Sequence, residues 1–173
     1  MCGKGVSMKR MILKTESVPP GRVMETLTAH GIQINAYAET FMSHPRFMTA
    51  SGETRTIVIA ELREIGLERG GTFGEIFARL PETGLKPCPA DTGLFLRMMW
   101  RDQQKSRNDV LSGTHQAPDM AVTVLSEMLE ADDSFPKGLY LRNVGGSLWL
   151  RGYVCDAVYR FPGDSLFAFE GEE

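Results

Sequence analysis

The sequence predicts a single α+β domain over residues 18–170, in which an N-terminal helical part packs on a mainly antiparallel sheet. Two observations support this prediction. Helical periodicity occurs at residues 18–45 and 72–80, whereas most of residues 94–170 consists of short apolar runs separated by turn residues. The chain has 173 residues, 42% of them hydrophobic, so one core of ordinary size is expected without disulfides or metal ions.

The N-terminal part begins with residues 1–12, which are expected to be disordered because they are mostly small, basic and polar. A helical hairpin is predicted over residues 18–45, with Gly31 at the turn between its two helices. The second helix shows the spacing of one buried face, at Ile34, Tyr37, Ala38, Phe41 and Met42. It ends at His44, since the residue before a proline leaves the α region.

The helix-covered sheet is predicted over residues 55–170. A β-branched run at residues 54–60 predicts its first strand, buried on both faces. Thr72 and Glu75 have the spacing of a capping box, in which each side chain binds the other residue's exposed backbone N–H. This pair predicts a helix over residues 72–80 that covers one face of the sheet.

A further strand is predicted over residues 94–101, because apolar side chains recur there with a period of two. The expected core face carries Leu94, Leu96, Met98 and Trp100. The opposite face carries Phe95, Arg97, Met99 and Arg101. Its two bulky apolar groups need cover, and the helical hairpin is the expected cover.

Five more strands are predicted after a long polar connection, at residues 120–129, 139–142, 148–151, 154–161 and 166–169. The first of these also has features of a helix, and a strand is chosen because the flanking segments are strands. The second and third flank Gly145 and Gly146, which predicts a β-hairpin.

The segment 72–102 resembles a recurring bacterial pattern. In that pattern a helix with an I-x-A-R core leads through G-L and C-P to an acidic residue, a glycine and an L-x-L-R segment that ends in an aromatic residue. The matching residues here are Ile76, Ala78, Arg79, Gly84, Leu85, Cys88, Pro89, Asp91, Gly93, Leu94, Leu96, Arg97 and Trp100. The resemblance is to an uncharacterised bacterial family of unknown function, so it implies no activity.

Cys88 is the candidate nucleophile. Cysteine catalysis needs a lowered thiol pKa and a base within hydrogen-bond reach. His115 is the best available base among the three histidines, and Asp91 is the candidate acidic partner. Together they define one alternative function, a small cysteine-dependent enzyme. The packing alternative is that Cys88 is a small apolar residue beneath the corner formed by its two flanking prolines.

Arg97 and Arg101 are the candidate ligand-binding residues. They share the predicted strand face with Phe95 and Met99, and arginine beside such side chains can bind nucleic acid or an anionic ligand. The net charge of −3 and the pI of about 5.7, however, give no general attraction for nucleic acid or an anionic membrane. A membrane partner is therefore not expected, and binding of nucleic acid or an anionic ligand through Arg97 and Arg101 is kept as the weaker alternative function.

The sequence predicts no metal site and no cofactor. No Cys or His pair has the close spacing of zinc ligands, and no glycine-rich phosphate loop occurs. Three scattered cysteines do not form a disulfide framework, which favours a reducing cytoplasm. No apolar run approaches the roughly 18 residues that would span a bilayer.

These absences lead to the expected function. The sequence contains no triad, no metal-ligand set and no acid–base pair at a defensible spacing. We therefore expect a cytoplasmic, non-enzymatic binding or interaction module. Its partner is unknown at this stage, and both a different protein and a second copy of the chain in a homodimer fit the sequence.

Overall fold

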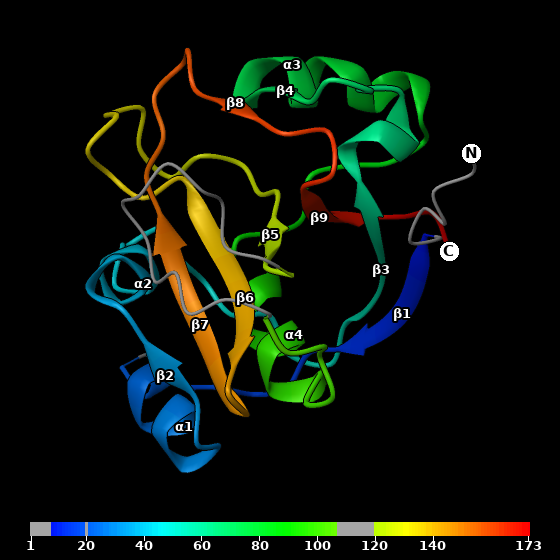
Figure 1. Ribbon diagram of the computed structural model, residues 1–173. Coiled ribbons are helices and arrows are strands. Elements are labelled where there is room, and N and C mark those ends of the chain that lie inside the picture. The colour runs from blue at the N-terminus through cyan, green and yellow to red at the C-terminus, as the bar shows by residue number, and fades with distance from the viewer. Residues whose placement is uncertain (1–7, 20, 107–119) are drawn as a thin grey trace.

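The computed structural model describes residues 8–19, 21–106 and 120–173, and it has an α+β fold (Figure 1). The strands of the main sheet are β1 (Lys9–Lys14), β2 (Gln33–Ile34), β3 (Thr54–Glu61), β5 (Val122–Val124), β6 (Gly138–Val144), β7 (Ser147–Tyr153) and β9 (Leu166–Glu170). They lie in the order β1-β3-β9-β5-β6-β7-β2. Only the β5–β9 and β2–β7 pairs are parallel, so the sheet is mainly antiparallel.

The helices and a small second sheet complete the fold. The helices are α1 (Val23–Ala29), α2 (Ala36–Met42), α3 (Phe73–Arg79) and α4 (Thr92–Met99), with short 3-10 turns η1 (Leu62–Ile65) and η2 (Leu80–Glu82). Strands β4 (Gly71–Thr72) and β8 (Arg160–Phe161) form a separate antiparallel pair. Within the described ranges, no helix combines the length and the apolar character that crossing a bilayer requires.

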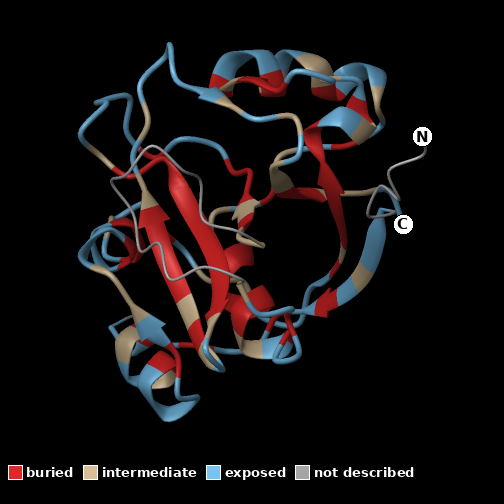
Figure 2. Ribbon diagram, in the orientation of Figure 1, coloured by how far each residue is buried: buried red, intermediate tan, exposed pale blue. Residues whose placement is uncertain are grey.

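The main sheet curves around helix α4. This helix contacts β1 at one edge of the sheet and also β6 and β7 near the other edge, so the sheet bends to meet it from both sides (Figure 1). Thr92 to Arg97 are all buried, and α4 and β6 are coloured as buried over most of their length (Figure 2). Helix α4 therefore lies at the centre of the molecule.

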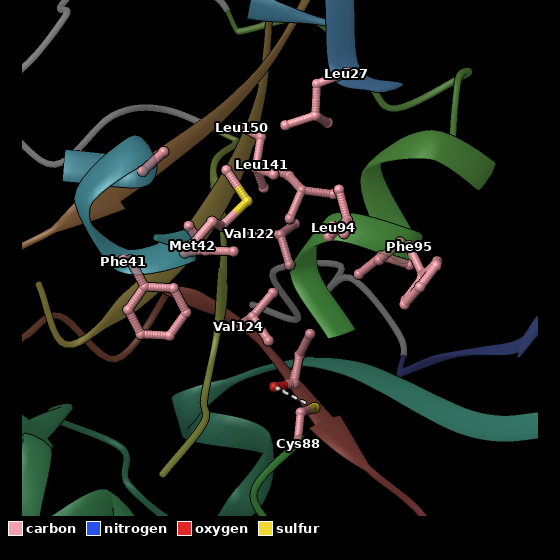
Figure 3. Packing of buried hydrophobic residues seen from close by; sticks show 14 of the residues in the cluster. Leu27, Phe41, Met42, Cys88, Leu94, Phe95, Val122, Val124, Leu141 and Leu150 are labelled. Atoms are coloured by element: carbon pink, nitrogen blue, oxygen red, sulfur yellow. Dashed lines mark hydrogen bonds between the residues drawn. The ribbon is translucent and has the colours of Figure 1, made fainter. Parts of the chain in front are cut away.

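The two faces of β3 and β9 contribute to two separate apolar clusters. Ile57 and Ile59 belong to the main cluster, which includes Leu94 and Leu141 around α4 (Figure 3). The alternate residues of β3 and β9 enter a second cluster beneath α3, formed by Val58, Ala60, Leu62, Ile65, Phe73, Ile76, Leu80, Leu85, Leu125, Phe167 and Phe169. The predicted burial of the first strand on both faces is thus confirmed.

Helix α2 meets β7 by a close backbone approach at Gly152. A Cβ atom at this position would lie 2.5 Å from the carbonyl carbon of Tyr37, so only glycine fits. The side chain of Asn35 bonds both backbone groups of Gly152, donating to its carbonyl oxygen at 3.1 Å and accepting from its N–H at 2.8 Å. It also caps α2 by accepting from the N–H of Ala38 at 2.9 Å.

Several local predictions are confirmed. Thr72 and Glu75 form the capping box of α3, with the Glu75 N–H 3.2 Å from the Thr72 hydroxyl and the Thr72 N–H 3.0 Å from the Glu75 carboxylate. Residues 122–124 are a strand, as chosen over a helix. The β6–β7 hairpin turns at Gly145 and Gly146, whose φ angles of 60° and 93° suit a two-residue hairpin turn.

The predicted strand over residues 94–101 is wrong, because residues 92–99 form helix α4. Leu, Met, Phe and Arg dominate this segment, and Leu, Met and Arg are strong helix formers, whereas no Val or Ile occurs. The apparent alternation arose because the segment is buried nearly all round. Arg97 itself is 0% exposed, so it does not mark a solvent-facing side.

Three other expectations also need correction. Of the residues 1–12 that were expected to be disordered, 1–7 lie outside the described residues, whereas residues 9–12 belong to β1, which pairs along its whole length with β3 and anchors Leu13 in the core. The segment 18–45 is not a simple helical hairpin, because β2 separates its helices and pairs with β7. Only the last two residues of 154–161 are in a strand, because the Asp156 carboxylate accepts two backbone N–H groups and forms a turn.

Thr72→Ala is expected to lower the free energy of unfolding by about 1 kcal/mol, because it removes the acceptor for an N-terminal helix N–H. Urea denaturation followed by circular dichroism measures the change. Thr28→Ala is the matched control, since the Thr28 hydroxyl bonds only the Met24 carbonyl within α1. Equal stability of the Thr72 variant and the wild type would show that the cap does not stabilise α3.

Candidate functional site

Cys88, the candidate nucleophile, is a buried structural residue. It is 1% exposed, and its thiol lies 3.6 Å from the carbonyl oxygen of Ala168 (Figure 3). Its N–H donates to the carbonyl oxygen of Leu125 at 2.7 Å, which ties the proline corner to the sheet. Burial raises the pKa of the thiol far above its usual range, and the negative charge of Glu170 acts in the same direction. Such a thiol is protonated at neutral pH.

Asp91, the proposed acidic partner, is the counter-ion of a buried arginine. Arg55 projects from β3 and donates to Asp91 at 2.6 Å, and the side chains of these two residues are 5% and 2% exposed. The Asp91 carboxylate also accepts from the N–H of Ala50 at 2.8 Å. Arg55 makes further bonds to Glu53 and to Thr92 at the start of α4. This network fixes the N-terminus of α4, and it occupies both oxygens of the Asp91 carboxylate.

Arg97 and Arg101 do not form a shared binding face. Arg97 points into the core from α4, where it donates to the Gln103 side chain at 2.6 Å and to backbone carbonyls of β6 and β7. Burial lowers the pKa of Arg97 to about 10, so the guanidinium still carries its charge at neutral pH. Arg101 lies outside the core and donates to the carbonyl oxygen of His30 at 3.0 Å. His115 lies outside the described residues.

A different site emerges where several segments meet beside α3. Two adjacent hollows of about 660 Å³ and 450 Å³ share Asp133, Cys155 and Asp156. The larger hollow is lined by α3, Pro87, the segment 127–137 and the segment 155–157. The smaller one continues along the segment 154–159. We call the two hollows together the α3 groove.

The floor of the α3 groove is apolar and aromatic. Phe73 and Phe77 of α3 line it with their ring centroids 4.9 Å apart, and Phe73 also packs edge-on against Tyr153. Tyr159 lines the smaller hollow and stacks edge-on against Phe161 at 4.9 Å. These rings join the groove to the second apolar cluster, so its floor is part of the folded core.

Several large apolar side chains around the groove remain open to solvent. Met128 is 44% exposed, Val158 is 78% exposed and Tyr159 is 46% exposed. All of them line one of the two hollows. Single exposed apolar residues are ordinary, but a contiguous set around a hollow is a feature of interaction sites.

The rim of the groove is acidic. Glu127, Asp133 and Asp156 are exposed and line it. Lys137 is the sole basic side chain among its lining residues, and it is only 3% exposed. Its ammonium group donates to the backbone carbonyls of Glu130, Ala131 and Asp132, at 3.0 to 3.4 Å. The positive charge of Lys137 is therefore committed to holding the groove wall.

The groove has little catalytic potential among its described residues. Cys155 lies between the two hollows, but burial raises the pKa of its thiol to about 11. Neither His30 nor His44 lines the groove. No group of three or more Cys, His, Asp or Glu residues in the described ranges could hold a metal ion.

The groove was not predicted from the sequence. Its walls come from four separate segments, and only the fold brings them together. Met128 and Val158 both fall in segments predicted as strands, 120–129 and 154–161, so neither marked an exposed apolar site.

Comparisons with protein-family models, curated proteins and solved structures found no match to this chain. Function is therefore inferred from the geometry of the groove.

Asp91→Asn is expected to destabilise the protein by about 3 kcal/mol, because it leaves the Arg55 guanidinium buried beside a neutral partner. Glu53→Gln is the matched control. It removes a charge from the same arginine, but at a side chain that is 55% exposed, so it should cost less than about 1 kcal/mol. Urea titrations of both variants measure the difference, and equal stabilities would contradict the structural role of Asp91.

The two described cysteines are expected to differ in their reaction with iodoacetamide. With a pKa of about 11, Cys155 should react roughly a hundredfold more slowly at pH 8 than in the unfolded chain, and its rate should still rise with pH above 9. Cys88 should not react in the folded protein. Peptide mass spectrometry follows each site separately. A rate at Cys155 that levels off below pH 9 would contradict the raised pKa.

Proposed function

We propose that this protein is a non-enzymatic binding module of the bacterial cytoplasm, and that the α3 groove holds an apolar segment of a partner protein. The main support for this proposal is that exposed apolar side chains lie directly beside the groove. A hollow of about 660 Å³ with an aromatic floor adjoins Met128, Val158 and Tyr159, which are between 44% and 78% exposed.

The openness of the groove favours a chain segment over a small molecule. Pockets for small molecules enclose roughly 70–90% of the surface of their ligand. Here Met128 and Glu127 on one wall and Val158 and Tyr159 beyond it are exposed, so the site is a trough rather than an enclosed cavity. A partner segment can lie along both hollows and extend out of them.

The rival functions have less support. A cysteine-dependent enzyme would rely on Cys88, which is buried with a strongly raised thiol pKa. Binding of nucleic acid or an anionic ligand would rely on Arg97, which is 0% exposed, and on Arg101, which bonds a backbone carbonyl. Arg97 offers no accessible cation, and the exposed Arg101 alone does not make the shared binding face that the sequence predicted.

The proposed compartment rests on the cysteines. Cys88 and Cys155, which are the cysteines of the described ranges, are both free thiols. Proteins of oxidising compartments commonly pair such residues, so free thiols favour a reducing cytoplasm. The bacterial origin rests on the resemblance of residues 72–102 to the bacterial pattern.

Selection of phage-displayed random dodecapeptides on the immobilised full chain tests the proposal. Enriched peptides should bind the wild type and bind Phe77→Asp about tenfold or more weakly, because a carboxylate would enter the apolar floor. Ile12→Asp is the control, since Ile12 is 59% exposed on β1, outside the groove. Circular dichroism confirms that both variants fold. Peptides that bind Phe77→Asp as well as the wild type, or a selection without enrichment, would overturn the proposal.

A further inference from the structure

We infer that the occupant of the α3 groove is cationic, namely a partner segment in which lysine or arginine accompanies apolar residues. The inference rests on the proposed function and goes on to name the chemistry of the partner. Three acidic side chains, Glu127, Asp133 and Asp156, line the groove, and the last two line both of its hollows. Any segment that lies along the groove must pass these carboxylates.

Among the described residues that line the groove, three carboxylates face one ammonium group, that of Lys137. Within the described ranges, no basic side chain forms an ion pair with Glu127 or Asp133. Lys137 makes no ion pair with them, since its ammonium group bonds three backbone carbonyls of the wall. Its single positive charge offsets only part of the three negative charges, so the groove stays net acidic toward a partner.

The position of one rim carboxylate is fixed by the fold. Asp156 accepts from the N–H groups of Val158 at 3.1 Å and Tyr159 at 2.8 Å through the same oxygen, Oδ1. This turn holds the carboxylate beside the exposed Val158 and Tyr159 side chains. The carboxylate is thus held next to apolar surface before any ligand binds. A ligand with both basic and apolar groups would therefore bind with little loss of conformational entropy in the protein.

Charge complementarity selects the occupant. An anionic segment would place like charges side by side. A purely apolar segment would remove water from the carboxylates without offering them new hydrogen bonds. Lysine and arginine instead combine an apolar stem, which can lie on Phe77 or Met128, with a charged head that reaches the rim. A basic and apolar segment thus satisfies both the floor and the rim.

A second copy of this chain is the competing occupant. The whole chain carries a net charge of −3, so its surface as a whole does not complement an acidic rim. Multi-angle light scattering over a range of protein concentrations distinguishes this case. A dimer of the wild type that dissociates in Phe77→Asp would overturn the inference in favour of self-association.

The test uses the same dodecapeptide selection with charge as the readout. Peptides enriched on the full chain should carry more Lys and Arg than the unselected library. The most enriched peptide, synthesised with a fluorescent label, should bind a Glu127→Lys, Asp133→Lys double variant at least about tenfold more weakly than the wild type, and high salt should weaken its binding to the wild type. Neither substituted side chain makes a hydrogen bond to another described residue, so the fold should persist.

Two controls separate the groove from general attraction to an acidic protein. Asp102→Lys changes an exposed acid just beyond α4 that lines neither hollow, and should alter the dissociation constant less than about twofold. A scrambled peptide of identical composition should bind more weakly than the selected one. Equal loss of binding in Asp102→Lys and in the double variant would overturn the inference.

The outcomes distinguish the two proposals. In one outcome, the enriched peptides carry no excess of Lys and Arg but still bind Phe77→Asp more weakly than the wild type. This result would support the apolar groove and overturn its cationic specificity. Peptides that bind Phe77→Asp and the double variant as well as the wild type would overturn both.

Discussion

Two buried guanidinium groups hold helix α4, and the curvature of the sheet depends on them. Arg55 projects from β3 and binds Asp91 and Thr92 at the N-terminal end of α4. Arg97, near the other end, donates to carbonyl oxygens of Arg142 on β6 and Trp149 on β7. The helix thereby links the β1–β3 side of the sheet to the β6–β7 side. A buried charge without such partners would cost several kcal/mol, so this arrangement strongly disfavours other positions of α4.

The same feature explains where sequence reasoning failed. A charged residue among apolar ones normally lies on the side of an element that faces away from the core, and Arg97 was assigned to that side of a predicted strand. In the structure its charge is satisfied by backbone carbonyls and by Gln103, none of which is adjacent to it in the sequence. Periodicity cannot reveal a side chain that is polar and yet buried, because the partners that make its burial possible come from distant segments.

Local signals were reliable where the partner is also local. The Thr72–Glu75 box and the Gly145–Gly146 turn were predicted because both interactions close within a few residues. The strand at residues 54–60 was predicted because burial on both faces leaves a β-branched run. Strand β1 was missed because its pairing with β3 joins segments more than forty residues apart, and its own sequence is rich in Lys and Arg.

The α3 groove was beyond sequence analysis for the same reason, since its walls are assembled from separate segments. Its outer wall, the segment 127–137, is nevertheless firmly held. Lys137 bonds three carbonyls within it, while Arg46 donates to the Leu129 carbonyl at 3.1 Å and His44 contacts the Glu130 carboxylate at 2.7 Å. Hydrogen bonds thus hold the wall together internally and also attach it to His44 and Arg46, which follow α2.

This anchoring bears on why apolar surface stays exposed beside the groove. A loop free to move would fold over Met128 and Phe77 and remove their apolar surface from water, because that burial is favourable. The bonds made by Lys137, Arg46 and His44 oppose such a collapse by fixing the backbone that carries Met128. The open trough is then a property of the folded state, and a partner that enters it meets a wall whose conformational entropy has already been lost on folding.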